Sequence, residues 1–274
     1  MMFSDLQTRR QFFLTSAAGL SAGLALTRGA RAENKTLAVR VEEMSETHAL
    51  SPALKIATDA AKMLEPVTNY TAVFHKKEQV GRSLIQAQKY LKLREEPFSV
   101  YLKFLTPHQG REALYVAGQH KNQVLVRETG FAGLAGTMAL DVRGSFAMEE
   151  NRYPITSIGL RNMMATTIET WLNEAALDEV QVAIKTGESF NNLKCTKVEI
   201  THPHRRANGS KYQNMRLYVD ESTRFPVAVQ AFDYPAQAGT TGPLIEEYFY
   251  ANLQVNPGLT EMDFSRKNPQ YRLK

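Results

Sequence analysis

The feature that most constrains this 274-residue chain is a long succession of short segments in which apolar and polar residues alternate. Strict alternation places every second side chain on the same face of a β-strand. The clearest row is Phe98, Val100, Leu102 and Phe104. Further segments of this kind lie at residues 70–78, 84–94, 113–117, 124–127, 180–186, 193–201, 212–220, 226–234 and 244–253. Short turns join most of them, which is typical of an antiparallel meander.

The alternation also predicts which side chains share a face. In residues 70–78 the apolar side chains lie on one face. We expect Lys76 and Glu78 to continue that face and to point toward solvent. In residues 84–94 the shared face holds Ile85, Ala87, Leu91 and Leu93.

Two segments have the spacing of amphipathic helices. The first begins at Ser51-Pro52, an N-cap residue followed by proline, and ends before Pro66. The second covers residues 155–172, with Leu160, Met164 and Ile168 on one face. Each helix has a single apolar stripe, so each can cover only one surface.

This pattern predicts an α+β fold with a mostly antiparallel, strongly curved sheet. We expect a half-barrel of about 10–11 strands with the two main helices on its concave side, because so wide an open sheet must curl or be covered. Two such helices cannot fill the whole hollow, which predicts an apolar cavity between helices and sheet.

The inward-facing side chains of such a cavity are the candidate ligand-binding residues. They are Tyr70, Phe74, Phe98, Val100, Leu102, Phe104, Leu114, Tyr115, Phe232 and Phe249. Arg111 and Glu112, at a strand start, are a candidate polar contact for a ligand. The plainer alternatives are packed core for the apolar residues and a surface ion pair for the charged ones. Glycine-rich segments at 129–146 and 235–243 interrupt the strand pattern and are candidate lids.

The N-terminus has the features of an export signal. Arg9-Arg10 precede an apolar stretch, and Ala30-Arg31-Ala32 resembles a signal-peptidase site. Paired arginines indicate a twin-arginine signal over residues 1–32. We therefore expect a polar leader at 33–50, a single half-barrel domain at 51–274 and a soluble protein in the periplasm or otherwise outside the cytoplasm. After cleavage no segment is long and apolar enough for an integral membrane span.

The charge balance argues against nucleic acid as a partner. The net charge is +5, but residues 1–32 supply +3 of it. The remainder is nearly neutral and has no basic run interleaved with aromatic residues.

Motifs for catalysis, metals and cofactors are absent from the sequence. His202 and His204 lie two residues apart without a nearby carboxylate at ligand spacing, and there is no phosphate-binding glycine loop. Cys195, the only cysteine, lies in an alternating strand segment where a small buried side chain is expected. We therefore expect no metal, no cofactor and no catalytic residue.

Several stretches resemble known families. Residues 97–102, 110–116, 152–155 and 158–160 resemble a family of exported bacterial proteins of unknown function, over about residues 65–272. More distantly, residues 220–226 together with Tyr248, Asn252 and residues 263–264 are similar to the outer-membrane lipoprotein-sorting carriers (LolA-like) and their sensor relatives. That resemblance implies an eleven-stranded half-barrel that binds acyl chains.

These observations favour an exported, non-enzymatic binding protein for a lipid or an acylated protein. The first alternative is an envelope interaction or sensor module, with an envelope protein as partner and a core filled by its own side chains. The second is an exported cofactor-dependent enzyme, a class of cargo that twin-arginine signals often accompany.

Overall fold

The computed structural model of the chain describes residues 37, 39–177, 179–205, 209–237 and 240–274. The expected export signal at 1–32 lies outside this part of the chain. Within it, no helix has the length and apolar character needed to cross a bilayer.

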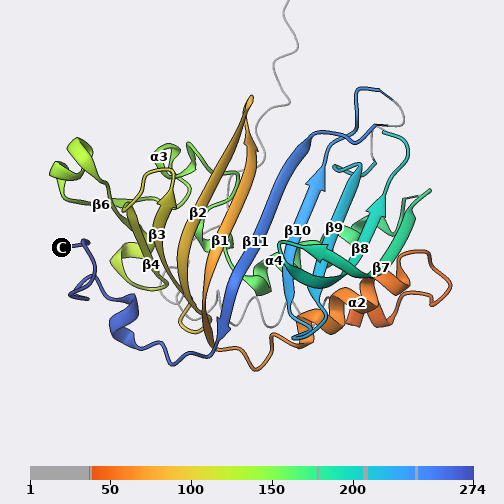
Figure 1. The fold of residues 1–274 in the computed structure, drawn as a ribbon, viewed down its shortest axis with the longest axis horizontal. Helices are drawn as coiled ribbons and strands as arrows, with labels where there is room; N and C mark the ends of the chain where they lie inside the picture. The colour runs from red at the N-terminus through yellow and green to blue at the C-terminus, as the bar shows by residue number, and fades with distance from the viewer. Residues whose placement is uncertain (1–36, 38, 178, 206–208, 238–239) are drawn as a thin grey trace, which may run out of the picture.

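A single antiparallel sheet of eleven strands organises the molecule (Figure 1). Its strands are β1 (Asn69–Val80), β2 (Ser83–Arg94), β3 (Ser99–Thr106), β4 (Glu112–Val116), β5 (Val124–Arg127), β6 (Thr137–Leu140), β7 (Gln181–Phe190), β8 (Leu193–Thr201), β9 (Asn214–Asp220), β10 (Pro226–Phe232) and β11 (Leu244–Val255). Their order across the sheet is β6-β5-β4-β3-β2-β1-β11-β10-β9-β8-β7. The first and second halves of the sheet therefore meet where β1 pairs with β11.

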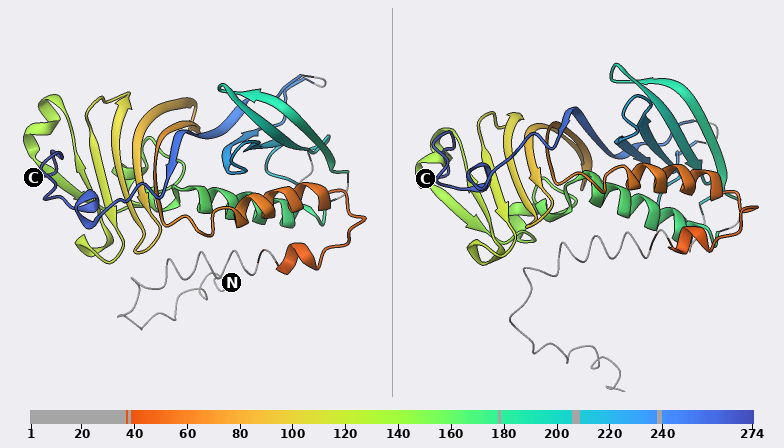
Figure 2. Two further views of the ribbon diagram at one scale, coloured as in Figure 1. Left: turned by 60° about the horizontal axis from the view of Figure 1, so that its bottom comes forward. Right: turned by 90° about the horizontal axis from the view of Figure 1, so that it is seen from below.

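The sheet is open, so β6 and β7 form its two edges. β6 has only four residues, and the register of the β7–β8 pair is broken between Lys185 and Glu188. Figure 2 shows the sheet arching over two helices, α2 (Ser51–Lys62) and α4 (Leu160–Glu174). The expected α+β fold, with a curved antiparallel sheet and helices on its concave side, is confirmed.

The main core fills the space between the two helices and the concave face of the sheet. Leu54 of α2, Trp171 of α4 and Leu217 of β9 are fully buried in it. Leu50, from the segment expected to be a polar leader, is also fully buried there. Burial of one apolar stripe from each helix explains why both helices lie flat against the sheet.

Two strand tyrosines hold the N-terminus of α4. The backbone N–H groups of Gly159 and Leu160 donate to the hydroxyls of Tyr250 and Tyr70, at 3.0 and 2.9 Å. The N-cap residue itself makes no side-chain cap. Gly159 has a φ of +127°, and a Cβ there would lie 3.0 Å from Leu93 Cδ1. Glycine thus permits the close approach of the helix to β1 and β2.

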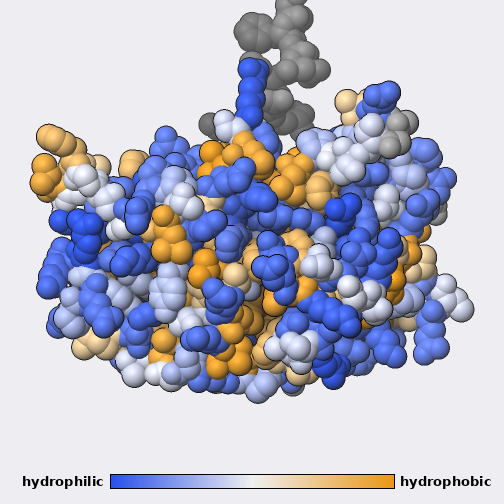
Figure 3. Space-filling model, viewed as in Figure 1, coloured by the Kyte–Doolittle hydropathy of each residue, from blue (hydrophilic) through white to orange (hydrophobic). Residues whose placement is uncertain are grey.

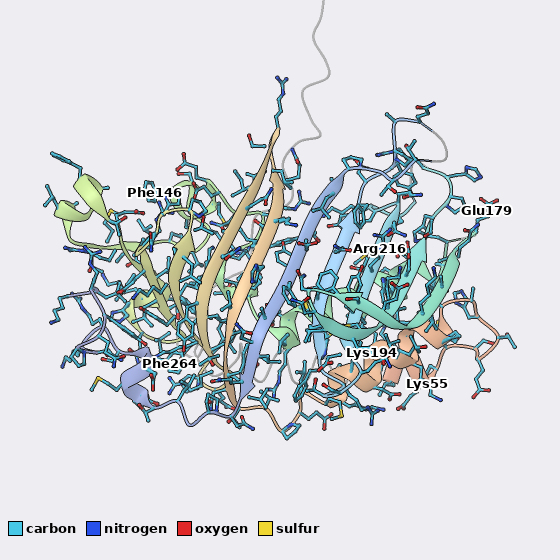
Figure 4. All side chains as sticks on the ribbon, in the orientation of Figure 1. Lys55, Phe146, Glu179, Lys194, Arg216 and Phe264 are labelled. Carbon is cyan, nitrogen blue, oxygen red and sulfur yellow. The ribbon has the colours of Figure 1, made fainter. Side chains whose placement is uncertain are left out.

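The outer face is covered differently at its two ends. Over β3–β5 the C-terminal segment, residues 261–274, buries Phe264, Tyr271 and Leu273 against the sheet. The segment starts with the 3-10 turn η4 (Glu261–Phe264), where Figure 4 labels Phe264. Over β9–β11, Phe190 from the tip of the β7–β8 hairpin stacks on Tyr218 at 4.1 Å. The rest of this face is mostly hydrophilic, as Figure 3 shows.

One strand was not expected. β6 lies inside the glycine-rich segment 129–146, which also contains the 3-10 turn η2 (Gly130–Ala135) and the short helix α3 (Ser145–Met148). In η2, which precedes β6 in the chain, Phe131 and Leu134 are 92% and 80% exposed. The segment extends the sheet by one strand before it turns back under the concave face.

Candidate functional site

A cavity of about 300 Å³ lies on the concave side of the sheet, within the volume range of small-molecule sites. Its roof is the inner face of β1–β6 and of β9–β11, and its floor is formed by the start of α4 and by residues 142–158. We call residues 141–158 the strap, because they cross beneath the sheet from β6 to α4. Phe146 of α3, labelled in Figure 4, lines the cavity and is 57% exposed, which places it at the rim.

One wall of the cavity is apolar. Its side chains come from seven strands, the strap and α4: Phe74, Leu102, Phe104, Ala113, Val124, Val126, Leu140, Val142, Ile155, Ile158, Met163, Met215 and Val229. A continuous wall of this kind can remove a hydrocarbon chain from water, at about 0.8 kcal/mol per CH₂.

Of the residues predicted from the sequence to contact a ligand, four line this cavity: Phe74, Leu102, Phe104 and Arg111. Four others point to the same concave side but are packed into the core beyond the cavity: Tyr70, Phe98, Val100 and Tyr115. Their neighbours are core side chains, so the alternative of packed core describes these four residues in the structure.

The remaining predicted residues lie elsewhere. Leu114 is buried on the outer face beneath the C-terminal segment, and Phe249 on the outer face near Phe190. Glu112 also faces outward, where it accepts a 2.7 Å hydrogen bond from the backbone N–H of Arg272. Phe232 contacts the guanidinium of Arg216 at 4.6 Å. Arg111 and Glu112, adjacent in sequence, therefore serve opposite faces of the sheet. Ligand binding by any predicted residue stays a prediction.

Lys89, which the sequence analysis did not select, is the most unusual residue of the cavity. In the sheet it lies directly between Phe74 of β1 and Phe104 of β3. Its side chain is 4% exposed, and its Nζ lies 4.4 Å from the centre of the Phe104 ring. Among the described residues the amine has no hydrogen-bond or ion-pair partner. Burial, reinforced by the neighbouring Lys76 ammonium, lowers the pKa of Lys89 to about 7.

A signal for Lys89 was present in the alternation. The face of β2 that holds Ala87, Leu91 and Leu93 includes position 89 by the two-residue period. A lysine at this position of an otherwise apolar row indicates an inward-facing charge.

Lys76 and Glu78 correct the sequence-based expectation. We expected them to face solvent, but they are 4% and 2% exposed. Lys76 Nζ donates to Glu78 Oε2 at 2.8 Å, to the Glu150 carbonyl at 2.7 Å and to Asn151 Oδ1 at 2.6 Å. The strap covers the end of the β1 face and supplies these partners, so both charges are buried and paired.

A second ion pair holds the strap at Arg152. Its Nε lies 3.1 Å from Glu246 Oε2, and its backbone N–H donates to Glu78 at 2.8 Å. The hydroxyls of Tyr153 and Tyr212 also donate to Glu246. Burial and the Glu246 carboxylate raise the pKa of both tyrosines, so both stay protonated donors.

Arg111 completes the charged wall. It forms an ion pair with Glu128 at 2.8 Å and a longer one with Glu150 at 3.3 Å. Glu150 in turn contacts His108 at 3.0 Å. The strap is therefore tied to β1, to β11 and to the start of β4 through polar contacts, while its apolar residues face the cavity.

No arrangement in the described part of the chain resembles a metal centre. No group of three or more His, Cys, Asp and Glu side chains converges there. His202, which was considered as a ligand, lies 3.1 Å from Glu174 at the end of α4. Cys195 is buried on the outer face, and burial raises its pKa to about 11, which disfavours the reactive thiolate.

Fold and cavity together define an open half-barrel protein with a partly apolar, partly charged internal site. The chain belongs to the family described as protein of unknown function (DUF1571), whose model matches residues 67–273. The resemblance to a family of unknown function is thereby confirmed. None of the curated proteins compared with the chain matches it.

Solved structures with a similar arrangement share little sequence with the chain. A putative outer-membrane lipoprotein-sorting protein domain from Vibrio parahaemolyticus has a TM-score of 0.36 and 15% identity, covering 78% of this chain and 96% of that one. An uncharacterised conserved protein from Thermus thermophilus has a TM-score of 0.43 and 11% identity, covering 81% and 97%.

The Mycobacterium tuberculosis lipoprotein LppX has a TM-score of 0.42 and 13% identity, covering 76% and 98%. The distant resemblance to lipoprotein-sorting proteins noted in the sequence thus recurs among solved structures. At TM-scores below 0.5 these likenesses carry no argument about function.

Proposed function

We propose that this protein is an exported, non-enzymatic binding protein that holds the acyl chain of a lipid or of an acylated protein in the concave cavity. The observation that carries the proposal is the apolar wall that side chains of the sheet, the strap and α4 form around a space of about 300 Å³. The size supports one hydrocarbon chain, since it is near the lower end of ligand-site volumes.

The energetics support the same proposal. A hydrocarbon chain in water costs about 0.8 kcal/mol per CH₂, so an apolar wall that encloses part of the chain offsets several kcal/mol. Binding of this kind needs shape and apolar surface, with no covalent step. The rim residue Phe146 and the exposed end of the cavity provide a way in for a chain.

The first test is binding by the intact protein. Native mass spectrometry of gently purified protein should detect a bound lipid, and a fluorescent acyl probe should bind to delipidated protein. Absence of both results would contradict the proposal and favour the interaction or sensor module.

A cavity-filling variant makes the test specific. Ala113 lies inside the cavity on β4 and is 6% exposed. Ala113→Phe should weaken acyl-probe binding by about tenfold or more, because the new ring occupies space that otherwise holds two or more CH₂ groups. The matched control is Ala139→Phe, at an exposed position of the edge strand β6. Circular dichroism should confirm that both variants fold.

A further inference from the structure

We propose that the ligand of this cavity is a single-chain amphiphile with a carboxylate head group, and that the Lys89 amine binds that carboxylate. The inference rests on the proposed function, because it specifies the head group of the same ligand. It starts from the position of Lys89, which lines the cavity between Phe74 and Phe104.

The first argument is the absence of a protein partner for Lys89. Buried ionisable side chains are normally paired with an opposite charge or hydrogen-bonded, because desolvation penalises the charged form. The Lys89 side chain is 4% exposed and has neither kind of partner in the part of the chain that is described. Its Nζ lies over the face of the Phe104 ring, at 4.4 Å from the ring centre. An amine left in this state is available for an acidic group that enters the cavity.

The second argument is the charge balance of the lining. The other cations there already have carboxylate partners: Lys76 pairs with Glu78, and Arg111 pairs with Glu128 and Glu150. Among the three cations of the lining, Lys89 alone has no carboxylate within ion-pair distance in the described part of the chain, and Glu78 and Glu150 act on it only from farther away. Its amine can therefore form a direct contact with a single acidic group. The same lining holds the carboxylates of Glu78, Glu128, Glu149, Glu150 and Glu246, which disfavour a head group with several negative charges more strongly than a head group with one.

The third argument is the junction of charge and apolar surface at Lys89. Phe74 and Phe104 flank Lys89 in the sheet, its amine lies over the Phe104 ring, and Leu102 and Ala113 continue the wall toward β4. A carboxylate on Lys89 Nζ therefore places the first carbons of its chain against aromatic rings. Fatty acids combine these two parts at this spacing, with a hydrocarbon chain attached directly to the carboxyl carbon.

The pKa of Lys89 makes a second, independent readout available. At neutral pH the amine is partly unprotonated, because burial lowers its pKa to about 7. An arriving carboxylate favours the protonated form, so binding takes up protons from the buffer. A neutral ligand of the same length has no such effect.

The experiment compares dodecanoate with dodecanol on delipidated full-length protein at about pH 7 by isothermal titration calorimetry. The wild type should bind dodecanoate about tenfold or more tightly than dodecanol, and dodecanoate alone should take up protons when buffers of different ionisation enthalpy are compared. Lys89→Met should bind both probes with equal affinity and without proton uptake. Lys89→Arg should retain the preference for dodecanoate.

The matched control is Lys103→Met, an exposed lysine on the opposite face of the neighbouring strand β3. It should leave the preference unchanged. Equal binding of both probes by the wild type, or a preference that survives in Lys89→Met, would overturn the inference while the proposed function stands. Failure of both probes to bind would overturn the proposed function and this inference together.

Discussion

On the concave face, two lysines of neighbouring strands differ in the partners that surround them. Lys76 of β1 is held by a carboxylate, a backbone carbonyl and an amide oxygen within 2.8 Å. Lys89 of β2 has an aromatic ring instead. Both are almost fully buried, so the difference lies in the strap, whose polar atoms reach Lys76. Position in the sheet, more than residue type, decides which lysine is available for a ligand.

Lys89 should make the stability of the ligand-free protein depend on pH. Its pKa is about 7 in the folded state and 10.5 in the unfolded chain, so the unfolded state binds more protons between these values. Stability therefore rises with pH across this range and loses this contribution as pH falls to about 7. Compared with Lys89→Met, the wild type should gain about 2 kcal/mol in its free energy of unfolding between about pH 7 and pH 9.

Urea denaturation of both proteins at the two pH values measures this difference. A constant difference between wild type and variant would show that Lys89 titrates in the same way in the folded and unfolded chain.

Among the elements, α4 depends on the sheet for its N-terminal hydrogen bonds. Its first N–H groups donate to hydroxyls of β1 and β11, the two strands at which the halves of the sheet meet. These contacts also fix the C-terminal end of the strap, because Gly159 directly follows the last residue of the strap. The helix, the strap and the central strands thus form one connected unit around the cavity.

Tyr250→Phe should destabilise the protein by about 1–3 kcal/mol, because it leaves the buried N–H of Gly159 without an acceptor. Chemical denaturation measures the loss. The control is Tyr90→Phe, since the Tyr90 hydroxyl makes no hydrogen bond in the described part of the chain. Equal stability of the two variants would contradict the capping role of Tyr250.

The elements were largely predictable from the sequence because alternation is a local property. Ten of the eleven strands correspond to segments predicted from the two-residue alternation, and both main helices to segments predicted from the helical spacing of apolar residues. β6 was not expected, because Gly130, Gly133 and Gly136 precede it and its four residues are too few for a clear alternation. Its pairing with β5 provides the stabilisation that its own sequence lacks.

The site was predictable only where it follows the strands. Phe74, Leu102 and Phe104 line the cavity because they share the inner face. Apart from their mutual ion pair, the partners of Lys76 and Glu78 come from residues more than seventy positions away, so no local pattern indicates that these charges are buried. Leu114 and Phe249 face outward, where the C-terminal segment and the tip of the β7–β8 hairpin cover apolar side chains that otherwise suggest the inner face.

For the molecule as a whole, the apolar side chains on both faces of the sheet are covered, while the hydrophilic part of the outer face meets solvent. The helices and the strap cover the concave face, and the last residues of the chain cover β3–β5 on the outer face. Tyr271 stacks on Tyr101 at 3.9 Å and donates to the carbonyl of Asp263 at 2.8 Å. The C-terminal segment therefore acts as part of the core, although it contains no strand.

Tyr271→Ala should lower the free energy of unfolding by about 3 kcal/mol, the usual cost of removing a buried aromatic ring. Met262→Ala, at a half-exposed position of the same segment, should change it by less than about 0.5 kcal/mol. Thermal or urea denaturation compares the two. Similar small losses would indicate that the segment is only loosely attached to the sheet.

The two margins of the open sheet have a consequence for self-association. A long, regular margin offers unpaired backbone groups on which a second copy could continue the ladder. β6 is too short for this, and β7 carries Lys185 and Glu188 at a break in its register. These two features disfavour strand-by-strand addition of further copies at either end of the unclosed sheet.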